Sequence, residues 1–143
     1  MSKPELDNLV KIRRLKAEAP SRAEYTRMLD SASKRLVDAQ NEELDADSQF
    51  DLAYGAAHRF ALAALRREGY RSDNNRLTVF QTLAHTVGTA NADLQVFLKA
   101  HAERNLAEYE GRTEIDAGLL KELLRCTKEL ESRVGKLEAP ESD

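Results

Sequence analysis

The chain has 143 residues, of which 41% are apolar and 33% are charged, and its formal net charge is −3. This length suits one domain with a single core, and the composition excludes a fibrous or disordered protein. The slightly negative charge excludes a general positive field that would attract nucleic acid or an anionic membrane, so any such binding must be local. No apolar run approaches the roughly 18 residues of a membrane span, and we therefore expect no membrane association.

Cysteine content and the first residues bear on the cellular compartment. The single cysteine, Cys126, cannot form a disulfide within the chain, and it occupies an apolar position of a predicted helix. The N-terminal sequence MSKPELDNLV lacks the apolar core of a signal peptide. Both features favour the cytoplasm, with Cys126 in the core rather than acting as a reactive thiol.

Residues 1–20 predict a helical N-terminal extension. An apolar stripe begins at Leu6 and continues to Leu15, and Pro20 ends the helix. The opposite side carries basic residues, but acidic residues stand among them. We therefore interpret this side as a solvated surface rather than a binding site.

Two long helices are predicted next, over about residues 22–41 and 46–68. The first begins with the capping-box sequence SRAE. The second has a broad apolar face with many alanines, which admit a close neighbour, and Gly69 stands where a left-handed residue ends a helix. We interpret His58 as a histidine hydrogen-bonded at the edge of the core rather than a catalytic group, because no acidic or cysteine partner stands at ligand spacing.

A group of basic residues surrounds the predicted loop 69–75. Its members are Arg66, Arg67, Arg71 and Arg76. Whether these four side chains converge depends on the fold. A shorter helix carrying His85 is predicted after the loop, over about residues 77–87.

The last two helices are predicted over about residues 92–110 and 116–137, the second preceded by a cap at residues 113–116, and the tail 138–143 should fray. The chain has six helical segments, short connections and no alternating strand pattern. The predicted fold class is therefore all-α: an up-and-down antiparallel bundle of about five to six helices, forming a single domain over residues 1–143.

The strong sequence signatures of enzymes are absent from the chain. It contains no glycine-rich phosphate loop and no CxxC, HExxH or GxSxG motif, and its three histidines are scattered. The acidic residues near 42–47 lie in a predicted turn, where we interpret them as caps of the following helix. We therefore predict no metal site and no cofactor.

One stretch, residues 101–111 with the sequence HAERNLAEYEG, has the chemistry of a site. Arg104 and Asn105 put a permanent cation and an amide near the end of a helix, where the two groups suit a phosphate. The alternative is a surface ion pair, because Glu108 lies four residues after Arg104. The sequence leaves both interpretations open.

Two segments together carry a resemblance to a known family. They are SQFDLAYGAAH through LRREGYR, over residues 48–71, and RNLAEY, over residues 104–109. The chain resembles, from about residue 25 to 137, the HEPN ("higher eukaryotes and prokaryotes nucleotide-binding") helical domains, especially small bacterial stand-alone members. The resemblance suggests five residues as ligand-binding candidates: Tyr54, His58, Arg104, Asn105 and Tyr109.

The resemblance implies a helical bundle that commonly forms a homodimer. Many HEPN proteins are metal-independent RNases of toxin–antitoxin and defence systems, while others bind nucleotides or act as scaffolds. The partners that this implies are a second copy of the chain, RNA or a nucleotide, and a nucleotidyltransferase or antitoxin protein.

This chain departs from the motif of active HEPN proteins, in which an arginine precedes a histidine by four to six intervening residues. Arg104 and Asn105 match the first half, but the window for the histidine contains Tyr109 and no histidine. A phenol, whose pKa is about 10, accepts a proton near neutral pH poorly compared with imidazole. His101 lies one helical turn before Arg104 and is the candidate substitute. The catalytic candidates are therefore Arg104, His101 and Tyr109.

These observations favour a catalytically degenerate HEPN-like binding or regulatory module that engages RNA, a nucleotide or a protein partner through Arg104 and Asn105. The first alternative is a metal-independent endoribonuclease of the toxin–antitoxin or defence type, with Arg104 on the scissile phosphate and His101 or Tyr109 transferring the proton. The second alternative is a structural protein that only dimerises, with Arg104 and Glu108 as a local ion pair.

Overall fold

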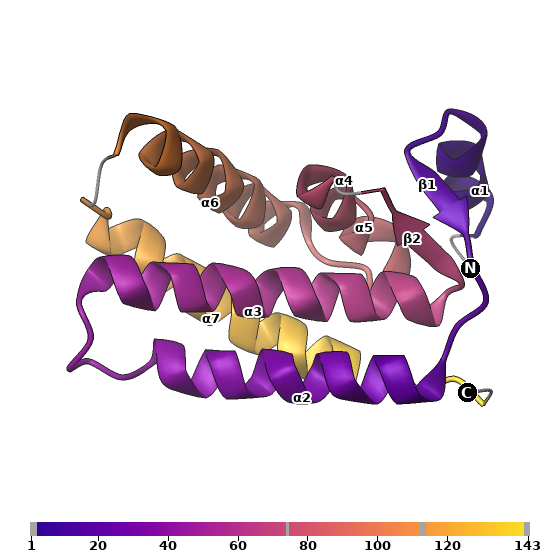
Figure 1. Cartoon of the computed structure of the whole chain (residues 1–143), viewed down its shortest axis with the longest axis horizontal. Coiled ribbons are helices and arrows are strands. Elements are labelled where there is room, and N and C mark those ends of the chain that lie inside the picture. The colour runs from indigo at the N-terminus through magenta and orange to yellow at the C-terminus, as the bar shows by residue number, and fades with distance from the viewer. Residues whose placement is uncertain (1–2, 74, 112–113, 142–143) are drawn as a thin grey trace.

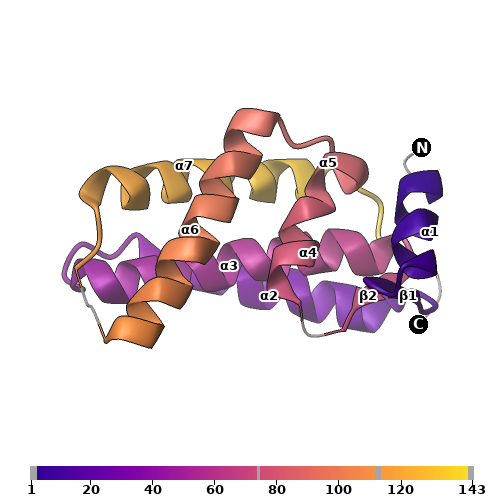
Figure 2. The same cartoon turned by 90° about the horizontal axis from the view of Figure 1, so that it is seen from above.

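The computed structural model describes residues 3–73, 75–111 and 114–141, most of them in helices (Figure 1). Four long helices run alternately in opposite directions: α2 (Arg22–Ala39), α3 (Ala46–Arg67), α6 (Asn91–Glu110) and α7 (Ala117–Gly135). Helix α2 lies antiparallel along α3, whereas α6 crosses α3 at a steep angle (Figure 2). The prediction of an all-α helical bundle is confirmed.

Helix α3 is the central element of the core. Its aromatic residues Phe50, Tyr54 and Phe60 are each 1% exposed. Between them lie buried alanines at positions 53, 56, 57, 61, 63 and 64. Because these side chains are small, α2 and α7 pack closely against the helix. Among the described residues, no helix is both long enough and apolar enough to cross a bilayer.

Side-chain caps fix where the long helices begin. Ser21 accepts a hydrogen bond from the backbone N–H of Glu24 at 3.2 Å, as the capping-box spacing predicts. Asp45 caps α3 by accepting from the N–H of Ser48 at 2.7 Å, which confirms the interpretation of the acidic turn. Asp116 caps α7 in the same way; residue 113, with which the predicted cap begins, lies outside the described residues.

The N-terminal residues do not form the single helical extension that we predicted for residues 1–20. Helix α1 covers Lys3–Lys11, and Arg13 then adopts a left-handed backbone with φ of 63°. Residues Leu15–Ala17 form strand β1, which pairs antiparallel with strand β2 (Tyr70–Ser72). The apolar periodicity of the extension cannot show this pairing, because the partner strand lies far along the chain.

The helix predicted over residues 77–87 is two short helices, α4 (Arg76–Gln81) and α5 (Leu83–Thr86). At the junction, the hydroxyl of Thr82 donates a hydrogen bond to the carbonyl of Val79 at 2.7 Å. Such a local bond competes with the helical ladder and accompanies the break here.

The C-terminal tail is held against the bundle, so the prediction of fraying is wrong for residues 138–140. The Nε of Arg67 donates to the carbonyl of Glu138 at 2.6 Å, and the Nε of Arg22 donates to the carbonyl of Pro140 at 2.8 Å. Pro140 is buried. The last two residues of the chain lie outside the described part.

The apolar stripe of α7 faces the core, and Cys126 belongs to it. This cysteine is 1% exposed, and burial raises the pKa of its thiol to about 12. A thiol that stays protonated is a poor nucleophile. The prediction that Cys126 is a core residue is therefore confirmed.

Candidate functional site

His101 of α6 is bonded at both nitrogens of its ring. Its Nδ1 lies 2.8 Å from the hydroxyl of Tyr54 on α3, and its Nε2 lies 3.1 Å from the amide nitrogen of Asn105. The rings of Tyr54 and His101 also stack, with centroids 6.1 Å apart and planes at 25°. The crossing of α6 over α3 therefore brings together three of the residues singled out in the sequence.

The partners of His101 fix a neutral imidazole. The atom of Asn105 that faces Nε2 is the amide nitrogen, which can only donate, so this arrangement assigns the ring proton to Nδ1, which donates it to the hydroxyl of Tyr54. Burial lowers the pKa of His101, and the nearby charges of Arg76 and Arg104 lower it further. This imidazole is therefore uncharged at neutral pH. Its Nε2 has a free lone pair, which accepts the hydrogen bond from the amide of Asn105.

A buried aromatic ring, Phe80 of α4, forms the floor beneath these groups. Its centroid lies 5.6 Å from that of Tyr54, 6.0 Å from that of His58 and 6.4 Å from that of His101. Phe97 stacks on its other side. We refer to Tyr54, His58, His101 and Asn105 as the histidine cluster.

His58 belongs to the cluster as a second neutral imidazole. Burial lowers its pKa to about 4, and the charges of Arg76 and Arg59 add to this effect. His58 lies at the edge of the core against Phe80, as we interpreted it from the sequence. Two uncharged imidazoles and several arginines therefore share one small region of the surface.

Arg104 makes the surface ion pair that the sequence allowed, and it also contacts the histidine cluster. Its guanidinium carbon lies 5.0 Å from the centroid of the Tyr54 ring, the geometry of a cation–π contact. The same guanidinium pairs with Glu108 at 3.3 Å and lies 4.0 Å from a carboxylate oxygen of Asp51. Arg104 therefore stands at the cluster, but two carboxylates neutralise much of its charge.

Arg76 is the cation at the cluster whose charge is not neutralised. Its guanidinium carbon lies 5.8 Å from the centroid of the Tyr54 ring. Among the described residues, no carboxylate oxygen lies within 4.0 Å of its side-chain nitrogens. Two pockets, of about 440 and 410 Å³, open on either side of it and share His58, Leu62 and Arg76 as lining residues. Arg76 is thus an accessible positive group beside two neutral histidines.

The four arginines that surround the loop 69–75 do not all converge on one place. Arg66 is buried and pairs with Glu24, and Arg71 pairs with the same carboxylate. Arg67 pairs with Glu68. Arg71 and Arg76 both line the pocket of about 410 Å³, but of the four only Arg76 also contacts the ring of Tyr54 in the histidine cluster.

Tyr109 is not part of the cluster. It is 91% exposed on the last turn of α6. It lies eight residues after His101, which corresponds to about 12 Å along the helix axis. The structure therefore brings Arg104, His101 and Asn105 together with Tyr54 and His58, but not with Tyr109.

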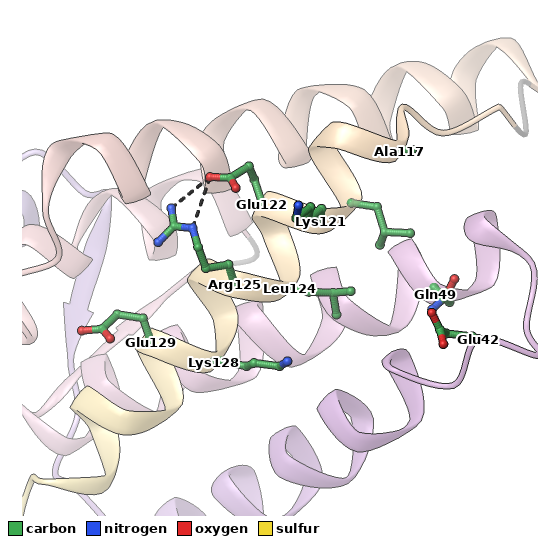
Figure 3. A pocket seen from close by; sticks show the side chains of 10 residues that line it. Glu42, Gln49, Ala117, Lys121, Glu122, Leu124, Arg125, Lys128 and Glu129 are labelled. Carbon is green, nitrogen blue, oxygen red and sulfur yellow. Dashed lines mark hydrogen bonds and ion pairs between the residues drawn. The ribbon is translucent and has the colours of Figure 1, made fainter.

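The largest pocket of the described residues, about 820 Å³, lies elsewhere, along α7 (Figure 3). Its lining has three acidic and three basic residues, and Arg125 pairs with Glu122 at 3.0 Å and with Asp93 at 3.2 Å. Such a surface has no unbalanced charge that would select a ligand. Size alone therefore does not make this pocket the functional site.

The sequence did not single out Arg76 or Phe80 as site residues. Arg76 was one of four basic residues around a loop, and Phe80 was one apolar position of a short predicted helix. Only the packing of α4 against α3 and α6 brings both residues to His101. Among the described residues, no group of three or more histidine, cysteine or acidic side chains could hold a metal ion.

Comparison with known proteins adds no assignment: no family model, no curated protein sequence and no solved structure matches this chain. The resemblance to HEPN domains therefore stays a prediction. What the site does has to be inferred from its own geometry, which combines one arginine with no carboxylate partner among the described residues, one largely neutralised arginine, two neutral imidazoles, a phenol and an amide.

Proposed function

We propose that this protein is a catalytically degenerate, HEPN-like binding module that holds a phosphate group of RNA or a nucleotide at the histidine cluster. The observation that carries the proposal is Arg76, a guanidinium with no carboxylate partner among the described residues, beside His58 and His101. In a chain of net charge −3, an accessible guanidinium of this kind favours an anionic ligand at this place.

The chemistry of the surrounding groups suits a phosphate. Arg76 supplies a planar donor set that matches two phosphate oxygens, and the exposed amide of Asn105 supplies N–H donors that can turn outward. Arg104 supports the same role once the ligand competes with Glu108, because a surface ion pair of this kind contributes only about 0.3–0.5 kcal/mol.

Binding is favoured over catalysis for two reasons. The sequence has no histidine in the window that active HEPN proteins use. In addition, both ring nitrogens of His101 are occupied by other side chains of the same chain. A proton acceptor that is already hydrogen-bonded is well suited to position its neighbours and poorly placed to take up a proton.

Fluorescence anisotropy with a labelled single-stranded RNA of mixed sequence, in EDTA, tests the proposal. Removing the charge with Arg76→Gln should weaken binding about tenfold or more, because a hydrogen bond to a charged group contributes roughly 1.5–3 kcal/mol. Lys128→Gln, which removes one exposed charge from α7, is the matched control and should bind like the wild type. Absence of binding by the wild type, or equal affinity of Arg76→Gln and wild type, would contradict the proposal.

A second candidate function is a metal-independent endoribonuclease, and the exposure of Asn105 favours it. If the amide turns away, the neutral Nε2 of His101 can accept the proton of a 2′-hydroxyl while that oxygen attacks the adjacent phosphorus. The bond from phosphorus to the 5′-oxygen then breaks, and the leaving oxygen takes a proton from solvent.

An RNA cleavage assay without metal separates the two candidates. An endoribonuclease of this kind should lose its activity in His101→Ala and keep it in Tyr109→Ala, because Tyr109 lies about 12 Å farther along α6. Intact RNA after long incubation with the wild type would exclude the enzyme and leave the binding module.

Homodimerisation is the third element of the proposal, and α6 supports it. Leu106 and Tyr109 of this helix are 40% and 91% exposed, which gives α6 apolar surface that a second copy can cover. Light scattering should then give a mass near twice the 16.1 kDa of one chain. A mass of one chain at micromolar concentration would argue against the dimer, and an added nucleotidyltransferase or antitoxin protein could be tested in the same way.

A further inference from the structure

Two arginines, Arg35 of α2 and Arg59 of α3, pass over the same glycine. A Cβ atom added to Gly55 would lie 3.3 Å from Nη1 of Arg59, 3.6 Å from Cδ of Arg35 and 3.9 Å from Nε of Arg35. One nitrogen of each guanidinium group therefore lies within 3.9 Å of the same point, the position of this added Cβ atom. Gly55 leaves room for this approach, because a Cβ here would be in tight contact with the guanidinium of Arg59.

No carboxylate among the described residues offsets this pair of like charges. Neither arginine has a carboxylate oxygen within 4.0 Å. Arg35 instead donates to the hydroxyl of Ser31 at 2.8 Å, and Arg59 donates to the carbonyl of Gly55 at 3.2 Å. Burial lowers the pKa of Arg59, and the charges of Arg35 and Arg76 lower it further. Each of the two cations thus has donor groups left for an external anion.

The pair is continuous with the histidine cluster. Arg59 and Arg76 line the same pocket of about 440 Å³, together with His58. The carboxylate in this pocket, Glu24, is engaged by Arg66 at 2.8 Å and by Arg71 at 2.5 Å. Arg76 of α4 and Arg59 of α3 therefore face one open pocket, and Arg35 of α2 lies beside Arg59 next to Gly55.

We propose that Arg35 and Arg59 form a second phosphate subsite, which holds the phosphate next to the one at Arg76 on the same single-stranded RNA. This inference rests on the proposed function, because it takes the first phosphate to lie at the histidine cluster. A ligand with several phosphates along one chain satisfies both places at once, whereas a mononucleotide satisfies one. The second subsite should therefore make the protein bind an RNA oligonucleotide more tightly than a mononucleotide.

The salt dependence of RNA binding measures this subsite directly. For single strands, each neutralised phosphate contributes about 0.7 to the slope of log K against log salt concentration. Because the two arginines hold one phosphate, Arg59→Gln and Arg35→Gln should each reduce the slope by up to roughly this amount, the double variant should reduce it by no more, and all should weaken binding of an RNA oligonucleotide. Both variants should bind a mononucleotide with the affinity of the wild type. Arg59→Lys keeps the charge and should largely keep the slope.

Gly55→Ala is an independent variant, because the added methyl group would push Nη1 of Arg59 away by a small distance without removing any charge. The substitution replaces a glycine within α3, so it should not weaken the helix. It should reduce oligonucleotide affinity and leave mononucleotide affinity unchanged. If Arg35→Gln, Arg59→Gln and Gly55→Ala all bind the oligonucleotide like the wild type while Arg76→Gln does not, the subsite is refuted and the proposed function stands.

A second probe distinguishes failure of the subsite from failure of the proposed function. NMR spectra of the arginine side chains, recorded with inorganic pyrophosphate, report on Arg35 and Arg59 without RNA. Shifts of their Nε–H signals in both wild type and Arg76→Gln support an anion subsite even where RNA does not bind at the cluster. Unchanged signals in both proteins would overturn the inference, whatever the result with RNA.

Discussion

His58 is a residue whose surroundings make the stability of the protein depend on pH. Its pKa is about 4 in the folded protein and 6.5 for the unperturbed group, so unfolding takes up a proton between these pH values. The stabilisation from this effect is fully present above pH 6.5 and is lost as the pH falls from 6.5 towards 4. Its full size is on the order of 3 kcal/mol.

Urea unfolding at a series of pH values from 7 down to about 4 tests this prediction. The free energy of unfolding should fall less steeply with pH in His58→Gln than in the wild type, because the glutamine does not titrate. Carboxylates contribute equally to the pH dependence of the free energy of unfolding in both proteins. The difference between the two plots of free energy against pH is therefore the contribution of His58. Parallel curves would show that His58 is not held neutral by the fold.

At the scale of elements, Arg66 joins the end of α3 to the segments on either side of it. The side chain is 2% exposed and donates to the carboxylate of Glu24 at 2.8 Å. It also donates to the carbonyls of Ala19 at 2.8 Å, Glu18 at 3.0 Å and Tyr70 at 3.3 Å. This one guanidinium thus satisfies backbone groups on both sides of the small β-sheet.

Replacing Arg66 by methionine should therefore destabilise the protein by about 3 kcal/mol or more, because it leaves three carbonyls without their donor, at roughly 1–3 kcal/mol for each buried group, while Arg71 still pairs with Glu24. Arg67→Gln is the matched control: its ion pair with Glu68 is more exposed, and the loss should stay near 1 kcal/mol. Denaturant unfolding of both variants measures the difference. Equal losses would mean that Arg66 does not join these segments.

Two glycines at the ends of helices allow a second prediction about the stability of these elements. Gly69, just beyond α3, has φ of 93°, so Gly69→Ala should cost about 1–2 kcal/mol through backbone strain. Gly135 lies within α7, and a Cβ there meets nothing within 4 Å. Gly135→Ala should therefore be neutral or stabilise the protein by up to about 1 kcal/mol. Thermal unfolding that moves in the same direction for both variants would contradict this.

At the scale of the whole molecule, the sequence predicts what depends on local patterns. The long helices, their caps and the all-α class follow from apolar periodicity and from residues such as Asp45, and the structure agrees. Contacts between segments that are far apart in the chain cannot be predicted from such local patterns. The pairing of Leu15–Ala17 with Tyr70–Ser72 and the bond from Arg22 to Pro140 join segments that no window of the sequence contains.

The candidate site also has one part that the sequence predicts and another that it does not. The spacing of His101, Arg104 and Asn105 on one helix is local, so the sequence identifies these residues together. Tyr109 shares their segment but not their surroundings, because helix geometry takes it about 12 Å past His101. Arg76 comes from another helix, and its approach to Tyr54 depends on the packing of α4, which the sequence does not specify.

The pKa of the His101 imidazole, measured by NMR with and without a short single-stranded RNA, tests the central claim most directly. Burial and the positive charges of Arg76 and Arg104 lower this pKa in the free protein. A phosphate bound between these arginines would offset their charge, so we expect the pKa of His101 to rise when RNA is added. A pKa that stays the same at the highest RNA concentrations would contradict phosphate binding at the histidine cluster.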